Sequence, residues 1–142
     1  MQLNRYTDYG LRLLTYLAVL PHGKRASIDE ISQTYGLSRN HINKIVHQLG
    51  KDGVIATKRG KGGGFCLARP ADQINLADMV ILLEKSMKII DCQTQACNIS
   101  PVCKLSAVIS EAGNAFIDSL KQYTLADLVQ DNQDTLVQIL KL

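Results

Sequence analysis

Three cysteines lie close together in the second half of the chain and are its most reactive group of side chains. Cys92, Cys97 and Cys103 are separated by four and by five residues, whereas the fourth cysteine, Cys66, lies far upstream. Three thiolates this close in sequence can converge on one soft metal centre. Zinc sites usually combine closer cysteine pairs with further cysteine or histidine ligands, and every histidine of this chain precedes position 48. The spacing favours an iron–sulfur cluster, with zinc or three unrelated cysteines as the alternatives.

A four-iron cluster held by three thiolates keeps one iron without a cysteine ligand. An oxygen or nitrogen ligand from elsewhere, including a second subunit, can fill that position, and such an iron is a natural entry point for a small reactive molecule. We therefore expect a 4Fe–4S cluster in preference to a 2Fe–2S cluster. A disulfide is disfavoured, because three cysteines leave one thiol over and cytoplasmic thiols stay reduced.

The overall composition is that of a folded cytoplasmic protein. The chain is 46% hydrophobic and 20% charged, which is ordinary for a folded domain. No apolar run is long enough to predict a membrane span, and the polar first eight residues lack the order of a signal peptide. We expect a cytoplasmic protein without a membrane partner.

Charge is divided unevenly along the chain. Residues 1–70 carry a formal charge of +7, and residues 71–142 carry one of −4. A basic half joined to an acidic half is typical of a nucleic-acid-binding module with a second part that does not bind. We predict a DNA-binding domain over residues 1–70 and a second region over residues 71–142 that contains the cysteine loop.

The basic half has the pattern of a helix-turn-helix. Apolar residues at helical spacing predict a helix over residues 5–20, and the capping box of Ser27 and Glu30 opens a second helix that ends at Gly36. A third helix begins at the Ser38 cap after a short turn. Its apolar stripe is Ile42, Ile45, Val46 and Leu49, and its opposite face is Arg39, Asn40, Asn43, Lys44, His47 and Lys51. Two such helices around a glycine-containing turn are typical of a helix-turn-helix.

A basic, glycine-rich hairpin follows, where a winged helix-turn-helix has its wing. Strands are predicted over residues 54–57 and 65–68, joined by the loop 58–64. The loop matches neither glycine-rich phosphate-binding motif, which disfavours a nucleotide-binding enzyme. A solvated basic helix with a flexible hairpin is the alternative, but the order of the elements favours DNA binding.

The residue types assign roles at the DNA. Arginine can pair with guanine and asparagine with adenine, so the first turn of the third helix is predicted to read bases. Glycines in the wing allow the main chain to approach the duplex. The predicted base-reading residues are Arg39, Asn40 and His41; the predicted phosphate and wing contacts are Ser38, Lys44, Lys58, Arg59, Lys61, Gly62 and Gly63.

The acidic half is expected to be helical around the cysteine loop. Asn75 caps a helix, residues 88–103 lack periodicity, and a long helix is predicted over residues 104–123, with Thr124–Asp127 capping a final helix. The fold class is therefore mainly α, a winged helix-turn-helix with a small β-hairpin wing. No set of acid, base and substrate-binding residues accompanies the cysteines, so we do not expect an enzyme.

The motifs together resemble those of the Rrf2 family of winged-helix regulators. The resemblance covers nearly the whole chain and is carried by residues 7–12 (TDYGLR), 38–41 (SRNH), 59–64 (RGKGGG), the cysteine loop and residues 123–129 (YTLADLV). Within the family, the sequence is most similar to the nitric-oxide-sensing repressors. The family's iron–sulfur-assembly regulators have a longer first cysteine gap and a histidine shortly after the third cysteine, where this chain has Ser106.

This resemblance implies a homodimer that uses the long helix near residues 104–123 for dimerisation. It implies a cluster held by Cys92, Cys97 and Cys103, with Asp8 of the partner subunit as the fourth ligand. The cluster-bearing form would bind operator DNA and repress, and nitric oxide would release it. Asp8 also has a plainer interpretation, because an acidic residue in the first turn of a helix is stabilised by the helix dipole. A redox-responsive or iron–sulfur-assembly regulator of the same family and a zinc-stabilised DNA-binding regulator remain the alternatives.

Overall fold

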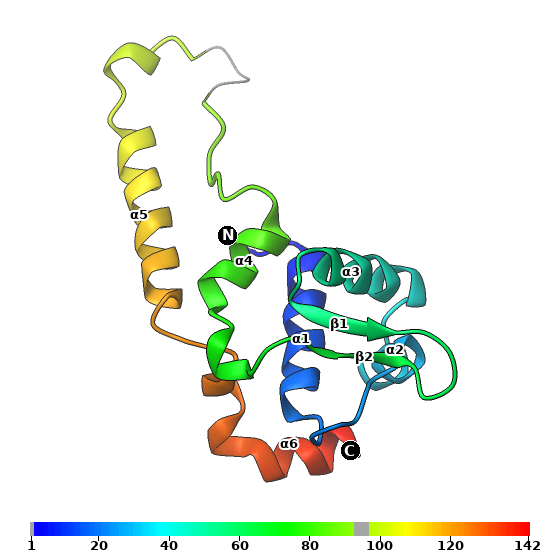
Figure 1. Ribbon diagram of the computed structural model, residues 1–142. Coiled ribbons are helices and arrows are strands. Elements are labelled where there is room, and N and C mark those ends of the chain that lie inside the picture. The colour runs from blue at the N-terminus through cyan, green and yellow to red at the C-terminus, as the bar shows by residue number, and fades with distance from the viewer. Residues whose placement is uncertain (1, 93–96) are drawn as a thin grey trace.

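The computed structural model describes residues 2–92 and 97–142. In this part of the chain the protein is mainly helical with one antiparallel hairpin, which confirms the predicted fold class (Figure 1). The elements are α1 (Arg5–Val19), α2 (Ile28–Tyr35), α3 (Arg39–Lys51), β1 (Ile55–Lys58), β2 (Gly64–Leu67), α4 (Leu76–Glu84), α5 (Leu105–Leu120) and α6 (Gln133–Leu140). Short 3₁₀ turns lie at Ala71–Gln73, Ser100–Val102, Ala126–Leu128 and Gln130–Asn132.

Helix α1 lies at the centre of the core. Its N-cap is Asn4, whose side chain accepts a hydrogen bond from the Thr7 backbone N–H at 2.8 Å. Leu13 and Leu14 on α1 are completely buried, and α1 packs against α3, α4, α6 and β2. The apolar periodicity of residues 5–20 therefore predicted this helix to within one residue.

Helix α2 begins and ends where the sequence predicts, and α3 begins where it predicts. Ser27 and Glu30 form both hydrogen bonds of the capping box, and Gly36 ends α2 in the left-handed conformation with φ 63°. All four residues of the predicted α3 stripe are buried. Ser38 occupies the N-cap position of α3, but its side chain makes no capping hydrogen bond.

Each strand is displaced by one residue toward the hairpin loop from its predicted position. The hairpin register pairs Ile55 with Leu67 and Lys58 with Gly64. Val54 instead closes the end of α3, where its N–H donates to the Leu49 carbonyl at 2.9 Å. A third segment joins the sheet, since Ala26 and Phe65 exchange two backbone hydrogen bonds of 2.9 Å. The wing is thereby anchored to the segment that leads into α2.

The cap predicted at Thr124–Asp127 forms, but it does not open the last helix. Asp127 accepts hydrogen bonds from the backbone N–H and the hydroxyl of Thr124 at 2.6 and 2.8 Å, and a 3₁₀ turn follows. Helix α6 begins only at Gln133, and a buried Leu125 anchors the intervening segment to the core. The prediction of a helix directly after the cap was therefore wrong.

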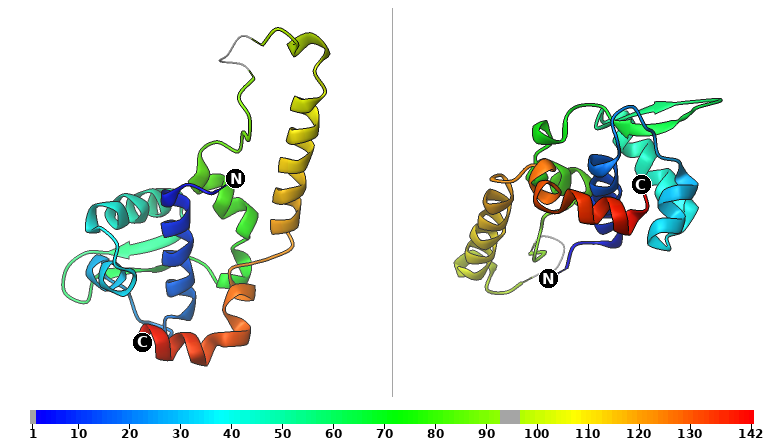
Figure 2. Two further views of the ribbon diagram at one scale, coloured as in Figure 1. Left: turned by 180° about the vertical axis from the view of Figure 1, so that it is seen from behind. Right: turned by 90° about the horizontal axis from the view of Figure 1, so that it is seen from below.

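Helix α5 contacts α4 and lies on the side of the molecule opposite the hairpin loop, whereas α6 returns beneath α1 (Figures 1 and 2). No residue of α5 is buried; Leu105 and Val108 are 60% and 57% exposed, while Phe116 and Leu120 are half-buried. One apolar side of this helix thus lacks a partner within the described chain. In residues 2–92 and 97–142, no helix has the length and apolar character needed to cross a membrane.

Candidate DNA-binding surface and cysteine loop

The turn between α2 and α3 is held by two hydrogen bonds between Leu37 and Ser32 of α2. The Leu37 N–H donates to the Ser32 carbonyl at 3.0 Å, and the Ser32 hydroxyl donates back to the Leu37 carbonyl. Because α3 buries its apolar stripe against α1 and α2, its polar face must point outward. The burial of this stripe therefore determines which side chains of α3 lie on the surface.

The predicted base-reading residues are all exposed, but they do not share one environment. Asn40 lies on the outward face, whereas Arg39 forms an ion pair with Asp29 of α2. His41 lies toward α1, with its ring centroid 6.0 Å from that of Tyr9. Arg39 is thus oriented by α2, and His41 lies beside Tyr9 of α1, which is half-buried against the core.

The predicted phosphate-contacting residues are exposed around the same surface. Lys44 lies on α3, and its backbone carbonyl accepts a hydrogen bond from the Tyr6 hydroxyl at 3.3 Å. Burial, followed by the charge of Asp52, raises the pKa of Tyr6, so this phenol stays protonated as a donor. Within the described residues, the structure gives no ion-pair partner to Lys44 or to the wing residues Lys58, Arg59 and Lys61.

The wing loop has a shape that only glycine allows at two positions. Gly62 has φ 71°, and a Cβ on Gly63 would lie 2.6 Å from the carbonyl oxygens of Lys58 and Gly60. The Gly63 N–H donates to the Gly60 carbonyl at 2.8 Å and closes the turn. A tight turn of this kind exposes the neighbouring basic side chains at the tip of the hairpin.

The cysteine loop connects α4 with α5. It begins at Lys85, a non-glycine residue with φ 63° that ends α4, and it contains the 3₁₀ turn just before Cys103. Cys92 and Cys97 are exposed, Cys103 is half-buried, and none of the three forms a disulfide. Residues 93–96 of the loop lie outside the described residues.

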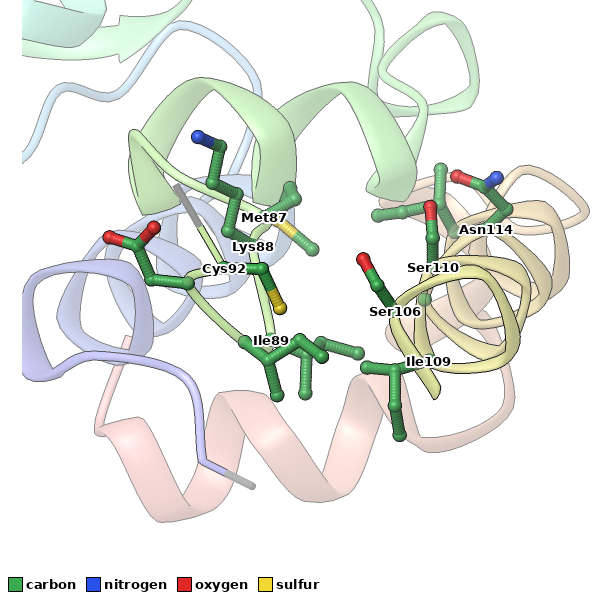
Figure 3. Close-up of a pocket in the computed structure, with 12 residues that line it drawn as sticks. Met87, Lys88, Ile89, Cys92, Ser106, Ile109, Ser110 and Asn114 are labelled. Carbon is green, nitrogen blue, oxygen red and sulfur yellow. The ribbon is translucent and has the colours of Figure 1, made fainter. Parts of the chain in front are cut away.

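A cavity of about 450 Å³ lies between the first part of this loop and α5. Figure 3 shows the Cys92 thiol directed into the space whose far wall carries Ser106 and Ile109. The Ile89 side chain closes the cavity against α5, where Gly113 lies opposite it. Ile89 thus brings the first part of the loop close to α5.

The donor set fits an iron–sulfur cluster in chemistry, because three free thiols, two of them exposed and one half-buried, lie within one loop. Among the described residues, however, no three cysteine, histidine or acidic side chains are gathered into one metal site. The predicted ligand Asp8 is half-buried on α1 and accepts a hydrogen bond from Arg12 Nε at 2.9 Å. This hydrogen bond and the carboxylate charge raise the pKa of Arg12.

A polar network that sequence reasoning missed joins α1 to the end of α4. Thr7, the single buried polar residue of the described core, donates from its hydroxyl to Glu84 Oε2 at 2.5 Å. The Asn4 N–H donates to both Glu84 carboxylate oxygens at 3.2 Å. Glu84 immediately precedes the cysteine loop, so the network attaches the start of that loop to the helix that carries Asp8. No local pattern in the sequence signals this pairing.

Comparison with known proteins identifies a family match over most of the chain. Residues 3–131 match the family Rrf2, described as an iron-dependent transcriptional regulator. Among solved structures, CymR (YrzC), the global cysteine regulator of B. subtilis, is 23% identical with a TM-score of 0.74, over 93% of this chain and 98% of that one. The IscR of T. potens is 21% identical with a TM-score of 0.72, over 95% and 90% of the two chains. Staphylococcus aureus CymR is 27% identical with a TM-score of 0.70, over 88% and 95%.

Proposed function

Because the chain belongs to the Rrf2 family of transcriptional regulators, we propose that it is a dimeric repressor that releases its operator DNA in response to nitric oxide. The observation that carries the DNA-binding part is the exposed polar face of α3 beside a basic wing. A recognition helix enters the major groove and phosphate contacts fix its register. The nitric-oxide part rests on the resemblance of the sequence motifs to the repressor NsrR.

In this proposal the second subunit packs along α5. Leu105 and Val108 expose large apolar side chains there, and burying them against another copy is favourable because it removes apolar area from water. A symmetric dimer presents two recognition helices about 34 Å apart, one turn of the duplex. We therefore expect a pseudo-palindromic operator.

Cys92, Cys97 and Cys103 would hold a 4Fe–4S cluster, with Asp8 of the partner subunit as the fourth ligand. Such a cluster supplies an iron atom that lacks a thiolate and reacts with nitric oxide. Asp8 lies on α1, which contacts α3 through Tyr6 and Tyr9. A ligand on α1 thus connects the cysteine loop of one subunit to the recognition helix of the other, which provides the two-site coupling that allostery requires.

The experiment combines anaerobic visible spectra with operator binding by fluorescence anisotropy, before and after stoichiometric nitric oxide. We expect visible absorption, bound iron and sulfide, and a loss of affinity after nitric oxide. Cys92→Ala should abolish the absorption, whereas Cys66→Ala is the matched control and should keep it, because Cys66 lies in β2.

Three outcomes contradict the proposal. A colourless protein with bound zinc favours the zinc-stabilised regulator. A cluster that ignores nitric oxide but responds to oxidants favours a redox-responsive or iron–sulfur-assembly regulator of the same family. Operator affinity that does not change when iron is removed refutes control by the cluster.

A further inference from the structure

A second feature of the α3 surface lies beside the residues predicted to contact DNA. A hollow of about 300 Å³ opens between the outer side of α3 and strand β1. It is lined by Asn43, Val46, His47, Gly50, Lys51 and Thr57. None of these residues was assigned a contact by the sequence motifs, and the hollow is separate from the cavity beside Cys92.

Gly50 keeps this hollow open. It lies within α3, where glycine is less favourable than alanine, and its backbone does not need the left-handed conformation. A Cβ at this position would lie 3.8 Å from Thr57 Cγ2 and 4.0 Å from Ile55 Cγ1, which are ordinary contacts. Neither backbone geometry nor crowding therefore requires glycine here, and the consequence of having it is open space between helix and wing.

The polar groups around the hollow are hydrogen-bond donors. Asn43, His47 and Lys51 follow one another at four-residue intervals and so share one side of α3. Thr57 faces them from β1, and Val46 forms a buried floor. Within the described residues, these four polar side chains have no hydrogen bond or ion pair. The nearest acidic residue in the sequence, Asp52, accepts a hydrogen bond from Gln48 at 2.6 Å.

The place of the hollow between recognition helix and wing determines what can reach it. A recognition helix occupies the major groove, and a basic wing lies along the backbone or in the adjacent minor groove. The DNA strand that separates these two grooves must pass between α3 and β1. An anionic group of that strand would meet Lys51, His47 and Thr57 together.

We propose that this hollow is a binding site for one phosphodiester group of the DNA backbone, with Lys51 as its charged contact and Thr57 as its contact from the wing. The proposal rests on the proposed DNA-binding function and goes beyond it by assigning a backbone contact to the far half of α3. Such a contact fixes how deeply α3 enters the groove, and it does so equally for every DNA sequence.

The test compares Lys51→Gln with the wild-type chain on two duplexes of equal length. One is an operator selected from random duplexes with the wild-type chain, and the other is a scrambled sequence. Lys121→Gln is the control with the same change in charge, because Lys121 is the C-cap of α5, at the end of that helix opposite the exposed Leu105 and Val108. Each phosphate contact makes the binding affinity fall by an extra factor of about 3.5 when the salt concentration rises fourfold. Losing one contact removes this factor from the salt dependence.

We expect Lys51→Gln to weaken binding to both duplexes by the same factor and to reduce the salt dependence by about this one contact. Lys121→Gln should change neither. Gly50→Leu, which fills the hollow, should weaken both duplexes equally while its circular dichroism spectrum and melting temperature show a folded chain.

Several results would refute phosphate binding in the hollow. A loss on the operator alone would indicate a base contact, and an equal effect of Lys121→Gln would indicate net charge. A folded Gly50→Leu chain with wild-type affinity would show that the hollow is not used. If the wild-type chain binds neither duplex, the failure is a different one. It refutes the proposed DNA-binding function itself and, with it, the proposed phosphate-binding site.

Discussion

Replacing Gly10 by alanine tests the seam between α1 and α4, which joins the first helix of the chain to the helix that leads into the cysteine loop. A Cβ at position 10 would lie 2.7 Å from Leu83 Cδ1 and 3.0 Å from Leu83 Cδ2. Carbon atoms in contact prefer about 3.5–4.0 Å, so the two helices or the leucine must move by about 1 Å. Leu83 is completely buried and has no solvent to turn into.

The expected magnitude follows from two opposing effects. Overpacking a buried contact costs about 1–3 kcal/mol. Alanine within a helix is better than glycine by about 0.5–1 kcal/mol, which offsets part of that cost. We expect Gly10→Ala to lower the free energy of unfolding by about 1–2 kcal/mol, which corresponds to a melting temperature lower by about 3–8 °C.

The assay is urea unfolding followed by circular dichroism, at one fixed protein concentration because a dimer's stability depends on it. Leu83→Ala alone should cost about 2–5 kcal/mol, because it leaves a cavity. In the double variant the added methyl group enters the vacated space, so its loss of stability should fall short of the sum of the two by about 1–2 kcal/mol. Additive losses, or a Gly10→Ala chain more stable than the wild type, would refute this account of the seam.

Two further predictions concern single polar contacts. Thr7→Val keeps the shape of the side chain but removes the donor to Glu84. We expect it to lower the free energy of unfolding in urea by about 1–3 kcal/mol, whereas Thr7→Ser should lower it much less because serine keeps the hydroxyl. Equal losses in the two variants would contradict the role of the hydrogen bond. The hydrogen bonds from the Thr124 backbone and hydroxyl hold the pKa of Asp127 below its ordinary value of 3.8. The ionised Asp127 therefore stabilises the fold above pH 3.8, and this stabilisation is lost as the pH falls through the lowered pKa of the folded protein. The stability difference between the wild type and Asp127→Asn should shrink between about pH 5 and pH 2. A difference that does not change over this range would show that the carboxylate charge is irrelevant.

The two ends of α2 are decided by neighbours in the sequence, and these boundaries were predictable. Ser27 and Glu30 fix the start of α2, and Gly36 fixes its end, because the capping groups and the bonds they satisfy lie within one turn. The stripe of α3 is likewise a local pattern. The strand boundaries were displaced because Val54 is used by the end of α3, a competition between two elements that no single window of sequence contains.

The last helix shows the same limit. Thr124 and Asp127 form the predicted cap, yet the following residues make 3₁₀ turns, since the burial of Leu125 and Val129 against the core directs the chain before α6 begins. Capping signals identify a hydrogen-bonding pattern. They do not specify how many residues continue in the same helix.

The sequence by itself determined the residue types and their local order: three cysteines close together, a helix with a basic and polar face, and a glycine-rich wing. Only the tertiary structure decided which of these groups meet distant partners. The contacts of Tyr6 and Tyr9 with α3, the attachment of Glu84 to Thr7 and the hollow beside Gly50 each join residues from separate elements. The physical reason is that side-chain periodicity specifies which face of an element is buried, whereas the partner it is buried against depends on how all the elements pack together.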